Sequence, residues 1–446
     1  MSVVDVTLDP SAATPSRVVA LNVVTRVGQG AFCDRAFAGE ALRVGLDPRA
    51  RAFAQTLAYG VVQRRRTLDW LIDAAVDRAK AIEPAVRDIL RVGAYELCYL
   101  DGVPERASVN EAVNAARVLA GPPKRQAARG GLVNAVLRRI GRDGRAGIDA
   151  LGDGDPESAA LKHSVPDALS QRLFDSLGPD DARAVLAAAN APAQSALRWN
   201  PLRGPRATLD ALLPPGWTGD PLLPEAVVLS GAFAFEESVA WEKGLAMPQS
   251  RSSMLPARVL APRRGERVLD LCAAPGAKAT HLAALSANGS QITAVELHES
   301  RGRALTALAR RLAARIEVVV GDARTVELEG SFDAVLVDAP CSGFGVLSAK
   351  PDARWRDRDI AELAALQAAL LRRAIRVTRP GGRVVYSTCT LTAEENEDVI
   401  RDTGLAIDDL SDEYPGLEHP KLPRALLALP HRFGSDGFFV ARMTVE

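Results

Sequence analysis

Cysteine is scarce in this chain, and its placement excludes two kinds of protein. Five cysteines occur in 446 residues, and no two of them form a CxxC pair. An odd number of scattered cysteines argues against a disulfide framework, and the missing CxxC spacing argues against a zinc site. We therefore expect reduced thiols, no bound metal and a cytoplasmic location.

The sequence also lacks a membrane segment, a leader and an excess of charge. No apolar run approaches the ~20 residues of a membrane span, and the start MSVVDVTLDPSAATPSR has no basic stretch followed by an apolar core. Lys+Arg and Asp+Glu both number 55, so the formal net charge is zero. The overall charge therefore gives no indication of a nucleic-acid partner. A packed protein with two or three domains and no membrane contact is expected.

Positive charge is nevertheless concentrated near the N-terminus. Residues 1–145 hold roughly 22 Lys and Arg against about 15 acidic residues. The clusters are Arg64 to Arg66 and the group Lys124, Arg125, Arg129, Arg138 and Arg139. Two interpretations stay open, an RNA-docking surface and a solvated helix face.

The first third of the chain has a helical pattern. Between residues 16 and 140 apolar residues recur every three or four positions, and Gly and Pro divide the stretch into about six helices. We predict an all-α bundle over residues 1–145. The Gly- and Asp-rich stretch 141–159 predicts a linker, and residues 146–260 are expected to hold linker and a small mixed α/β subdomain, with a short strand in SALRWNPL (195–202).

The pattern changes after Pro262. The β-branched runs RVLDLC, QITAVEL, IEVVVGD, FDAVLVDAP and GGRVVYSTC alternate with helical stretches between residues 267 and 389. This alternation predicts a parallel, doubly wound, Rossmann-like α/β domain over residues 261–446. Ligands of such sheets bind at the carboxyl ends of the strands, where the sequence places Cys272, Glu296, Asp322, Cys341 and Cys389.

The turn after the first of these strands, DLCAAPGAK (270–278), indicates a nucleotide site. Small residues let a ligand approach the backbone, and the following helix offers free N–H donors. Neither GxGxxG nor GxxxxGK[ST] occurs here, which disfavours a dinucleotide dehydrogenase and a P-loop enzyme. Glu296 is placed to accept hydrogen bonds from ribose hydroxyls, and Asp322 from an adenine amino group. An adenosine cofactor without a pyrophosphate, S-adenosyl-L-methionine, is expected.

Two thiols beside an acid suggest the reaction. Carbon 5 of cytosine is too weak a nucleophile for a sulfonium methyl group, but a thiolate that adds to carbon 6 makes carbon 5 reactive. Cys341 and Cys389 end neighbouring strands in the expected order, and Asp338 is placed to protonate or hydrogen-bond ring nitrogen 3. The sequence thus holds the groups needed for cytosine-5 methylation.

The ordered motifs DLCAAPGAK, VLVDAPCSGFGVL, PDARWR, YSTCTLTAEENE and DGFFVAR closely resemble those of RNA 5-methylcytosine methyltransferases. The resemblance implies that Cys389 of the TC motif attacks the base and that Cys341 of the PC motif helps to release the product. DNA cytosine methyltransferases use the PC cysteine for attack. The cofactor contacts that the resemblance implies are Cys272, Ala273, Ala274, Pro275, Gly276, Ala277, Lys278, Glu296, Arg301, Asp322 and Asp338.

Three positions depart from the family pattern. The usual AAPGGK is AAPGAK, so Ala277 adds a methyl group near the expected cofactor and is predicted to weaken its binding modestly. Glu296 replaces the usual aspartate. The stretch MPQSRSS keeps only Gln249 and Ser253 of a VQDEAS-like segment.

The N-terminal segments resemble the NusB-type RNA-binding bundle, and the combination resembles bacterial 16S rRNA cytosine-5 methyltransferases of the RsmB or Sun type. This implies an enzyme that acts on 16S rRNA or a small-subunit assembly intermediate, not on DNA, at a flipped or unpaired cytidine. The sequence does not reveal the oligomeric state, and a monomer is the default expectation. The basic groups Arg64 to Arg66 and Lys124 to Arg139 are expected to dock the RNA. The alternatives are a tRNA cytosine-5 methyltransferase and an RNA-binding, antitermination-like scaffold with an inactive methyltransferase core.

Overall fold

The computed structural model describes residues 13–76, 82–231 and 233–446. The first 12 residues, part of the stretch expected to carry no leader, lie outside the described residues. The chain forms two compact units, residues 1–191 with 347–356, and residues 192–346 with 357–446. Within the described ranges no helix is long and apolar enough to cross a membrane.

The first unit is helical, as predicted, and the part before residue 150 contains six described helices. Four of the six have proline in their first turn, where the missing N–H costs no hydrogen bond. The elements are α1 (Pro15–Gly28), α2 (Cys33–Val44), α3 (Pro48–Ala74), α4 (Pro84–Tyr99), α5 (Glu105–Arg117), α6 (Pro123–Asp149), α7 (Pro156–His163), α8 (Asp167–Leu177), α9 (Pro179–Ala188) and the 3-10 turn η3 (Pro351–Trp355).

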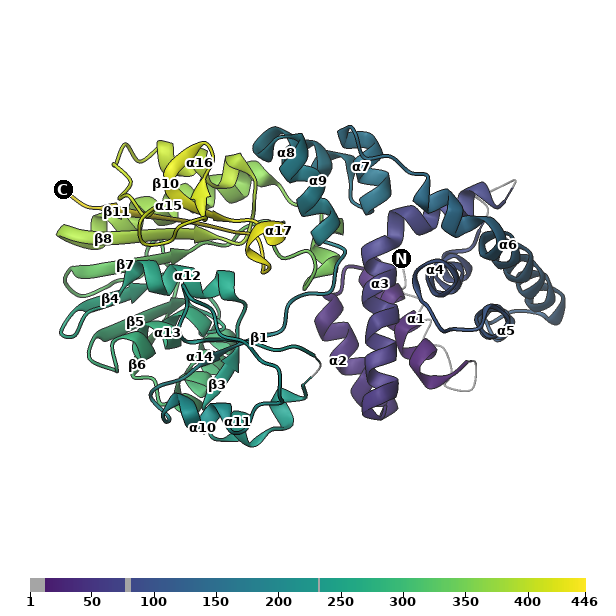
Figure 1. Ribbon diagram of the computed structural model, residues 1–446, viewed down its shortest axis with the longest axis horizontal. Helices are drawn as coiled ribbons and strands as arrows, with labels where there is room; N and C mark the ends of the chain where they lie inside the picture. The colour runs from purple at the N-terminus through teal and green to yellow at the C-terminus, as the bar shows by residue number, and fades with distance from the viewer. Residues whose placement is uncertain (1–12, 77–81, 232) are drawn as a thin grey trace. The chain divides into compact units, whose positions relative to one another are not determined.

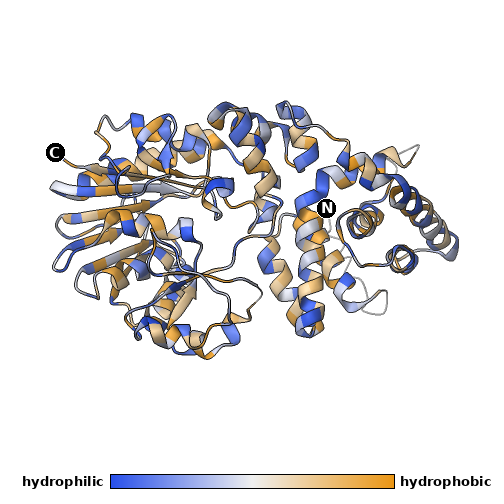
Figure 2. Cartoon of the chain, in the orientation of Figure 1, coloured by the Kyte–Doolittle hydropathy of each residue, from blue (hydrophilic) through white to orange (hydrophobic). Residues whose placement is uncertain are grey.

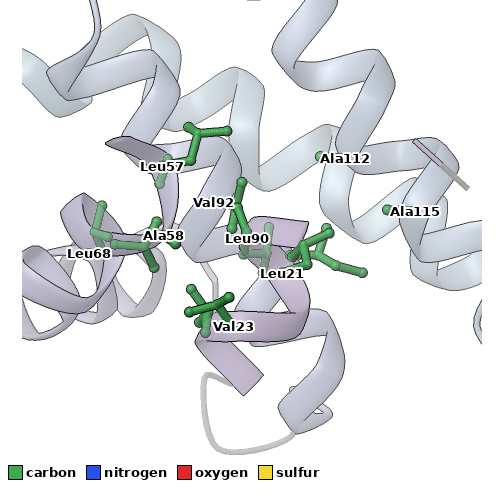
Figure 3. Close-up of a cluster of buried hydrophobic side chains, with 14 of the residues drawn as sticks. Leu21, Val23, Leu57, Ala58, Leu68, Leu90, Val92, Ala112 and Ala115 are labelled. Carbon is green, nitrogen blue, oxygen red and sulfur yellow. The ribbon is translucent and has the colours of Figure 1, made fainter. Parts of the chain in front are cut away.

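The core of this unit lies where α1, α3, α4, α5 and α6 meet. Figure 3 shows Leu21 and Val23 of α1 beside Leu90 of α4, with Leu57 and Leu68 of α3 in the same cluster. All five side chains are buried. The cysteines of α2 and α4, Cys33 and Cys98, are also buried here, which confirms that they are core residues.

The expected linker over residues 141–159 is wrong at both ends, because α6 continues to Asp149 and α7 begins at Pro156. Two glycines of α6 in this stretch are close-packing positions: a Cβ added at Gly144 would lie 2.9 Å from the Cys98 sulfur, and one at Gly141 would lie 2.6 Å from the Glu105 carboxylate. Glycine here lets neighbouring side chains approach the helix, so the glycine content that suggested a linker reflects helix packing instead.

The expectation that Arg64 to Arg66 form a free docking surface is wrong. Arg64 lies over the ring of Tyr99, 4.8 Å from its centroid, and Arg65 lies over the ring of Trp355. Arg66 donates to the carbonyl of Val165. These guanidinium groups are therefore used for packing inside the helical unit.

The residues of the second basic group, Lys124 to Arg139, differ in their ion pairs and in their exposure to solvent. Arg125 and Arg129 both form ion pairs with Glu83, and Arg129 is buried. Lys124, Arg138 and Arg139 are exposed on α6. Arg125 is also exposed although it is ion-paired, so four of the five residues keep the exposure that RNA docking needs.

The segment 347–356 belongs to the helical unit although its flanks belong to the other unit. Arg354 is 1% exposed and donates to the carbonyls of Gln63 (3.0 Å) and Ala189 (2.9 Å) and to the side-chain oxygen of Asn190 (2.9 Å). The indole of Trp355 donates to the carbonyl of Val62 at 2.7 Å. A single buried guanidinium thus connects the middle of α3 to the residues that follow α9.

We expect Arg354→Ala to destabilise the full chain by about 3 kcal/mol, because at least three buried acceptors lose their donor. The measurement is the midpoint and slope of urea unfolding. Arg106→Ala, a change of the same chemistry at an exposed position of α5, is the matched control. Equal midpoints for the two variants would contradict the assignment.

The second unit contains two sheets. A small antiparallel sheet has the order β2-β1-β3, and its β1 confirms the short strand predicted in SALRWNPL. Its elements are β1 (Ala196–Trp199), α10 (Arg206–Asp210), β2 (Ala226–Val228), η2 (Phe235–Glu237), α11 (Val239–Glu242) and β3 (Ala246–Pro248).

The large sheet has eight strands in the order β6-β5-β4-β7-β8-β11-β10-β9. Its elements are α12 (Arg251–Leu260), β4 (Arg267–Asp270), α13 (Ala277–Leu285), β5 (Gln291–Glu296), α14 (Glu299–Arg311), β6 (Ile316–Val320), β7 (Phe332–Asp338), α15 (Ile360–Val377), β8 (Thr378–Thr388), η4 (Ala393–Glu395), α16 (Glu397–Arg401), β9 (Glu418–His419), β10 (Leu422–Ala428), α17 (Pro430–Phe433) and β11 (Phe438–Thr444).

The five predicted strands are all present and pair in parallel. The expectation of a purely parallel sheet is incomplete, because β11 pairs antiparallel with β8, and β10 and β9 continue antiparallel. Helices α12 and α13 pack on the sheet, and α15 packs against β7 and β8 (Figure 1). Figure 2 shows hydrophobic residues along the sheet strands and hydrophilic ones on the outer side of α6.

Candidate active site

The turn between β4 and α13 is built for close approach of a ligand. Gly276 has φ +108°, and a Cβ there would lie 3.1 Å from Leu305. Glycine is therefore favoured here for two reasons: its backbone adopts a positive φ without strain, and a side chain would crowd Leu305. The carbonyl of Gly276 accepts from the amide of Thr280, so the turn leads directly into α13. The turn predicted from DLCAAPGAK is thus present at a strand end.

Asp270 ends β4 and is fully buried. One oxygen accepts from the amide of Cys272 at 3.3 Å, and the other has no hydrogen-bond partner among the described residues. Burial and the nearby Asp338 raise the pKa of Asp270 to about 7, against the opposing effect of Lys278. A buried carboxylate oxygen without a partner is costly, so this atom calls for a donor that the chain itself does not supply.

Glu296 and Arg301 connect the end of β5 to the turn. The carboxylate of Glu296, 4% exposed, accepts from the amide of His298 at 3.0 Å and lies 3.4 Å from the Arg301 guanidinium. Arg301 in turn donates to the carbonyl of Ala274 at 2.9 Å. The structure therefore brings together these three sequence-predicted residues.

Asp322 follows β6 in an exposed loop, where its carboxylate is 2.6 Å from the guanidinium of Arg324. The hydrogen bonds from Arg324 lower the pKa of Asp322. Its contact with an adenine ring stays a prediction, since any such contact would compete with Arg324.

Asp338 ends β7 and is held from two sides. One oxygen lies 2.7 Å from the Lys278 ammonium group, and the other accepts from the hydroxyl of Ser387 at 3.0 Å. Lys278 also donates to the hydroxyl of Ser253 at 3.2 Å. Sequence reasoning missed the roles of Ser387 and Ser253, although Ser253 was one of the two residues that MPQSRSS shares with the family.

Arg198 is a second residue that the sequence did not single out. It lies on β1, is 1% exposed, and donates to the side chain of Gln249, to the carbonyl of Ala277 and to the hydroxyl of Thr280. The Arg198 guanidinium therefore fixes the position of the first turn of α13 through its hydrogen bonds to Ala277 and Thr280. The only sequence signal was an arginine inside a short buried strand.

The two predicted thiols lie side by side. Asp338 and Ser387 are register partners on β7 and β8, and Cys341 and Cys389 follow them by three and two residues. The two sulfur atoms are 3.2 Å apart, and the amide of Gly345 donates to the carbonyl of Cys389 at 2.9 Å. The hydrogen bond to Cys389, burial, and the charges of Glu395 and Asp338 raise the pKa of Cys341 well above its usual value.

The third thiol near the site differs from this pair. Burial and the carboxylate of Asp270 raise the pKa of Cys272 far above its ordinary value, so its thiol stays neutral. Its expected place beneath the cofactor stays a prediction. In the portion of the chain with described coordinates, no group of three His, Cys, Asp or Glu side chains could hold a metal ion.

These residues fit S-adenosyl-L-methionine. The cofactor carries a sulfonium, an ammonium group and a ribose diol, all of which favour carboxylate neighbours. Acids stand at the ends of four adjacent strands, Asp270, Glu296, Asp322 and Asp338, and the buried Asp270 oxygen lacks a donor. The residues that would hold the cofactor are these acids and the turn from Cys272 to Lys278.

Comparisons with known proteins agree with this geometry. The family model described as 16S rRNA methyltransferase RsmB/F matches residues 257–444, and the NusB family model matches residues 14–142. The chain is therefore a methyltransferase, and S-adenosyl-L-methionine is its cofactor.

Relatives are similar over nearly the full length. The probable ribosomal RNA small subunit methyltransferase B of Bacillus subtilis is 35% identical over 420 residues, 89% of this chain and 91% of that protein. The ribosomal RNA small subunit methyltransferase B of Thermus thermophilus is 34% identical over 436 residues, covering 97% and 98%. The crystal structure of PH0851 matches with a TM-score of 0.78, 25% identity and coverage of 96% and 98%. The chain belongs to the RsmB/F family of 16S rRNA methyltransferases, with a NusB-family domain ahead of its catalytic core.

Proposed function

We propose that this enzyme methylates carbon 5 of a cytidine in 16S rRNA through a covalent cysteine adduct. The observation that carries the proposal is the pair of sulfur atoms 3.2 Å apart, Cys341 and Cys389, at strand ends beside Asp338. Two thiols at one base allow attack and release to be divided between them.

The first step is addition of the Cys389 thiolate to carbon 6 of the base. A sulfur–carbon bond forms, the double bond between carbons 5 and 6 opens, and carbon 5 becomes electron-rich. Cys341 remains a thiol, since its neighbours disfavour its charged form, and its S–H can donate to the Cys389 sulfur. Such a hydrogen bond stabilises the thiolate before attack.

The bound cofactor supplies a methyl group on a positively charged sulfur, which carbon 5 accepts. Release then needs two events. A water molecule takes the proton from carbon 5, and the electron pair of that C–H bond re-forms the ring double bond; at the same time the bond between carbon 6 and the Cys389 sulfur breaks, and its electron pair returns to that sulfur. Cys341 is the neighbouring group that assists this release, with its sulfur in contact with the departing one.

Asp338 holds the base during these steps. Its carboxylate accepts from Lys278 and Ser387, which fixes its orientation at the end of β7. In the proposed complex a proton shared between the Asp338 carboxyl group and nitrogen 3 of the cytosine joins the two, and it offsets the negative charge that develops on the ring when the thiolate adds.

Further features of the function are part of the same proposal. The substrate is free 16S rRNA or a small-subunit assembly intermediate, and the enzyme acts as a monomer. Residues 1–145 bind RNA, residues 146–260 connect, and residues 261–446 perform catalysis. The target cytidine is unpaired or flipped, because carbon 6 is inaccessible inside a stacked helix. A cytoplasmic location stays a prediction.

Methylation mapping tests the proposal. Purified enzyme and S-adenosyl-L-methionine are incubated separately with unmodified 16S rRNA and with unmodified tRNA, and 5-methylcytosine is located by bisulfite sequencing. We expect one cytidine of the rRNA to be modified and the tRNA to stay unmodified. Modification of tRNA alone would favour the tRNA enzyme, and methylation at another atom or base would contradict the proposal.

A further inference from the structure

Arg198 is a buried arginine on the middle strand of the small sheet, where its register partner on β3 is Met247. Its guanidinium donates to the Met247 sulfur (3.1 Å), to the side-chain oxygen of Gln249, to the carbonyl of Ala277 and to the hydroxyl of Thr280 (2.9 Å). All four acceptors are uncharged. The planar fork of donors thus connects separate segments of the chain, and its hydrogen bonds do not serve to neutralise an acid.

The first turn of α13 is one of these segments, and it carries Lys278. The carbonyl of Ala277, the residue before Lys278, accepts directly from Arg198. The hydroxyl of Thr280 accepts from Arg198 and donates to the carbonyl of Gly276 at 2.7 Å. The carbonyls of the two residues that precede Lys278 are therefore held by Arg198, one directly and the other through Thr280.

A second connection reaches the side chain of Lys278 through Gln249. The side-chain amide of Gln249 donates to the carbonyl of Ser253 at 2.9 Å, and its oxygen accepts from Arg198. The hydroxyl of Ser253 accepts from the ammonium group of Lys278 at 3.2 Å. That ammonium group lies 2.7 Å from the carboxylate of Asp338. A continuous series of contacts thus runs from Arg198 to Asp338.

The small sheet explains why Arg198 and Gln249 meet. Strands β1 and β3 pair antiparallel, and just after β3 the backbone amide of Gln249 donates to the carbonyl of Ala196 at 3.1 Å. The side chain of Gln249 is buried, so solvent does not replace Arg198 as the donor to its oxygen. A shift of this side chain would therefore also move Ser253, the hydrogen-bond acceptor of Lys278.

We propose that Arg198 is a positioning residue for methylation and that it acts through Lys278. Together with Gln249 it sets the ammonium group beside Asp338, at the end of the turn expected to hold the cofactor. Displacement of a reacting or orienting group by about 1 Å can lower a rate on the order of 10²-fold. The contact of Asp338 with the base rests on the proposed function, whereas the position of Lys278 exists without any RNA.

Acetylation of lysine tests the position of Lys278 in the absence of substrate. Full-length wild type, Arg198→Met and Gln249→Met are pulsed with acetic anhydride, and mass spectrometry gives the labelling rate of Lys278 relative to the exposed Lys124 of the same molecule. The Lys278 side chain is 11% exposed, so its labelling in wild type is expected to be slow. We expect the relative rate to rise about tenfold in both variants, because the ammonium group loses a fixed hydrogen bond.

Arg311→Met is the matched control. The Arg311 guanidinium also joins a helix to the region of the small sheet, since it donates from α14 to the carbonyls of Trp241 (3.1 Å) and Ala246 (3.5 Å). These acceptors lie outside the series of contacts that leads to Lys278, so the labelling rate of Lys278 should stay at the wild-type value. An equal rise in Arg311→Met overturns the proposal, and so does the absence of a rise in either of the other two variants.

A double-mutant cycle separates positioning from general support of the fold. Single-turnover transfer of a radiolabelled methyl group to unmodified 16S rRNA is measured for Gln249→Met, for Lys278→Met and for the double variant. We expect Gln249→Met to lower the rate about tenfold when Lys278 is present and to have no further effect when Lys278 is already replaced. An equal loss in both backgrounds would mean that Gln249 supports only the fold, which overturns the proposal.

Gln249→Met decides the matter if Arg198→Met does not fold, because it leaves the hydrogen bonds from Arg198 to Ala277 and Thr280 in place. The labelling experiment needs no RNA, so it is independent of the reaction that the enzyme performs. The expected labelling pattern together with methylation at another atom or base would contradict the proposed function and leave the role of Arg198 standing.

Discussion

Cys389→Ala is expected to lose methylation activity by at least on the order of 10³-fold. Without a thiolate that adds to carbon 6, carbon 5 of cytosine stays too weak a nucleophile to take up the methyl group. Cofactor binding should survive, because the acids at the strand ends and the turn from Cys272 to Lys278 are untouched.

Transfer of a radiolabelled methyl group to unmodified 16S rRNA measures this loss. Cys33→Ala removes a thiol from the core of the helical unit and serves as the matched control, with activity close to wild type. Retained activity in Cys389→Ala, with loss in Cys341→Ala, would exchange the roles of the two thiols.

Cys341→Ala is expected to give a different result, the accumulation of a covalent complex between protein and RNA. Loss of the Cys341 hydrogen bond slows the attack by Cys389 but does not prevent it, so the adduct and the methyl transfer should still occur. Release is slowed because the neighbouring sulfur, 3.2 Å away in the native site, is missing. We expect most of the enzyme to be trapped while turnover falls by about 10²-fold.

A denaturing gel shows the trapped complex as a slowly migrating band that nuclease treatment removes. The double variant Cys341→Ala/Cys389→Ala should show no such band, which ties the adduct to Cys389. A band that persists in the double variant would mean that another side chain attacks the RNA.

The parts of the fold that follow from local patterns were predicted from the sequence. The five parallel strands are continuous β-branched runs, and such runs are buried on both faces of an α/β sheet. Because parallel strands share one carboxyl edge, the order of motifs along the chain was enough to bring Cys341, Cys389 and Asp338 together. The hydrogen-bonded partners Lys278 and Ser387 were not predicted, since only the folded sheet shows which side chains meet.

Patterns with two physical explanations were misread. Glycines in α6 looked like a linker because glycine is common both in flexible segments and where side chains press against a helix. Arg64 to Arg66 looked like a docking surface because arginine serves both phosphate binding and stacking on aromatic rings. Antiparallel strands β9 to β11 were missed because their pairing follows from the position of β8 in the sheet rather than from their own sequence.

The buried Glu395 shows a further limit. A glutamate in TAEENE looks solvent-exposed, since glutamate is almost never fully buried unless paired. Its four donors come from three separate segments of the chain, and no sequence spacing reveals them. Only in the folded chain do Ser342, Gln367 and Thr392 meet around this carboxylate.

The chain passes between the two units at three places, after residues 191, 346 and 356. A gene fragment that ends at residue 191 would encode a helical unit without Arg354 and Trp355. The carbonyls that accept hydrogen bonds from these two side chains would then lose those donors. The complementary fragment would carry those ten residues with nothing to enclose them. Neither unit is therefore encoded by one uninterrupted stretch of the gene, and a single cut cannot separate the two with their own contacts intact.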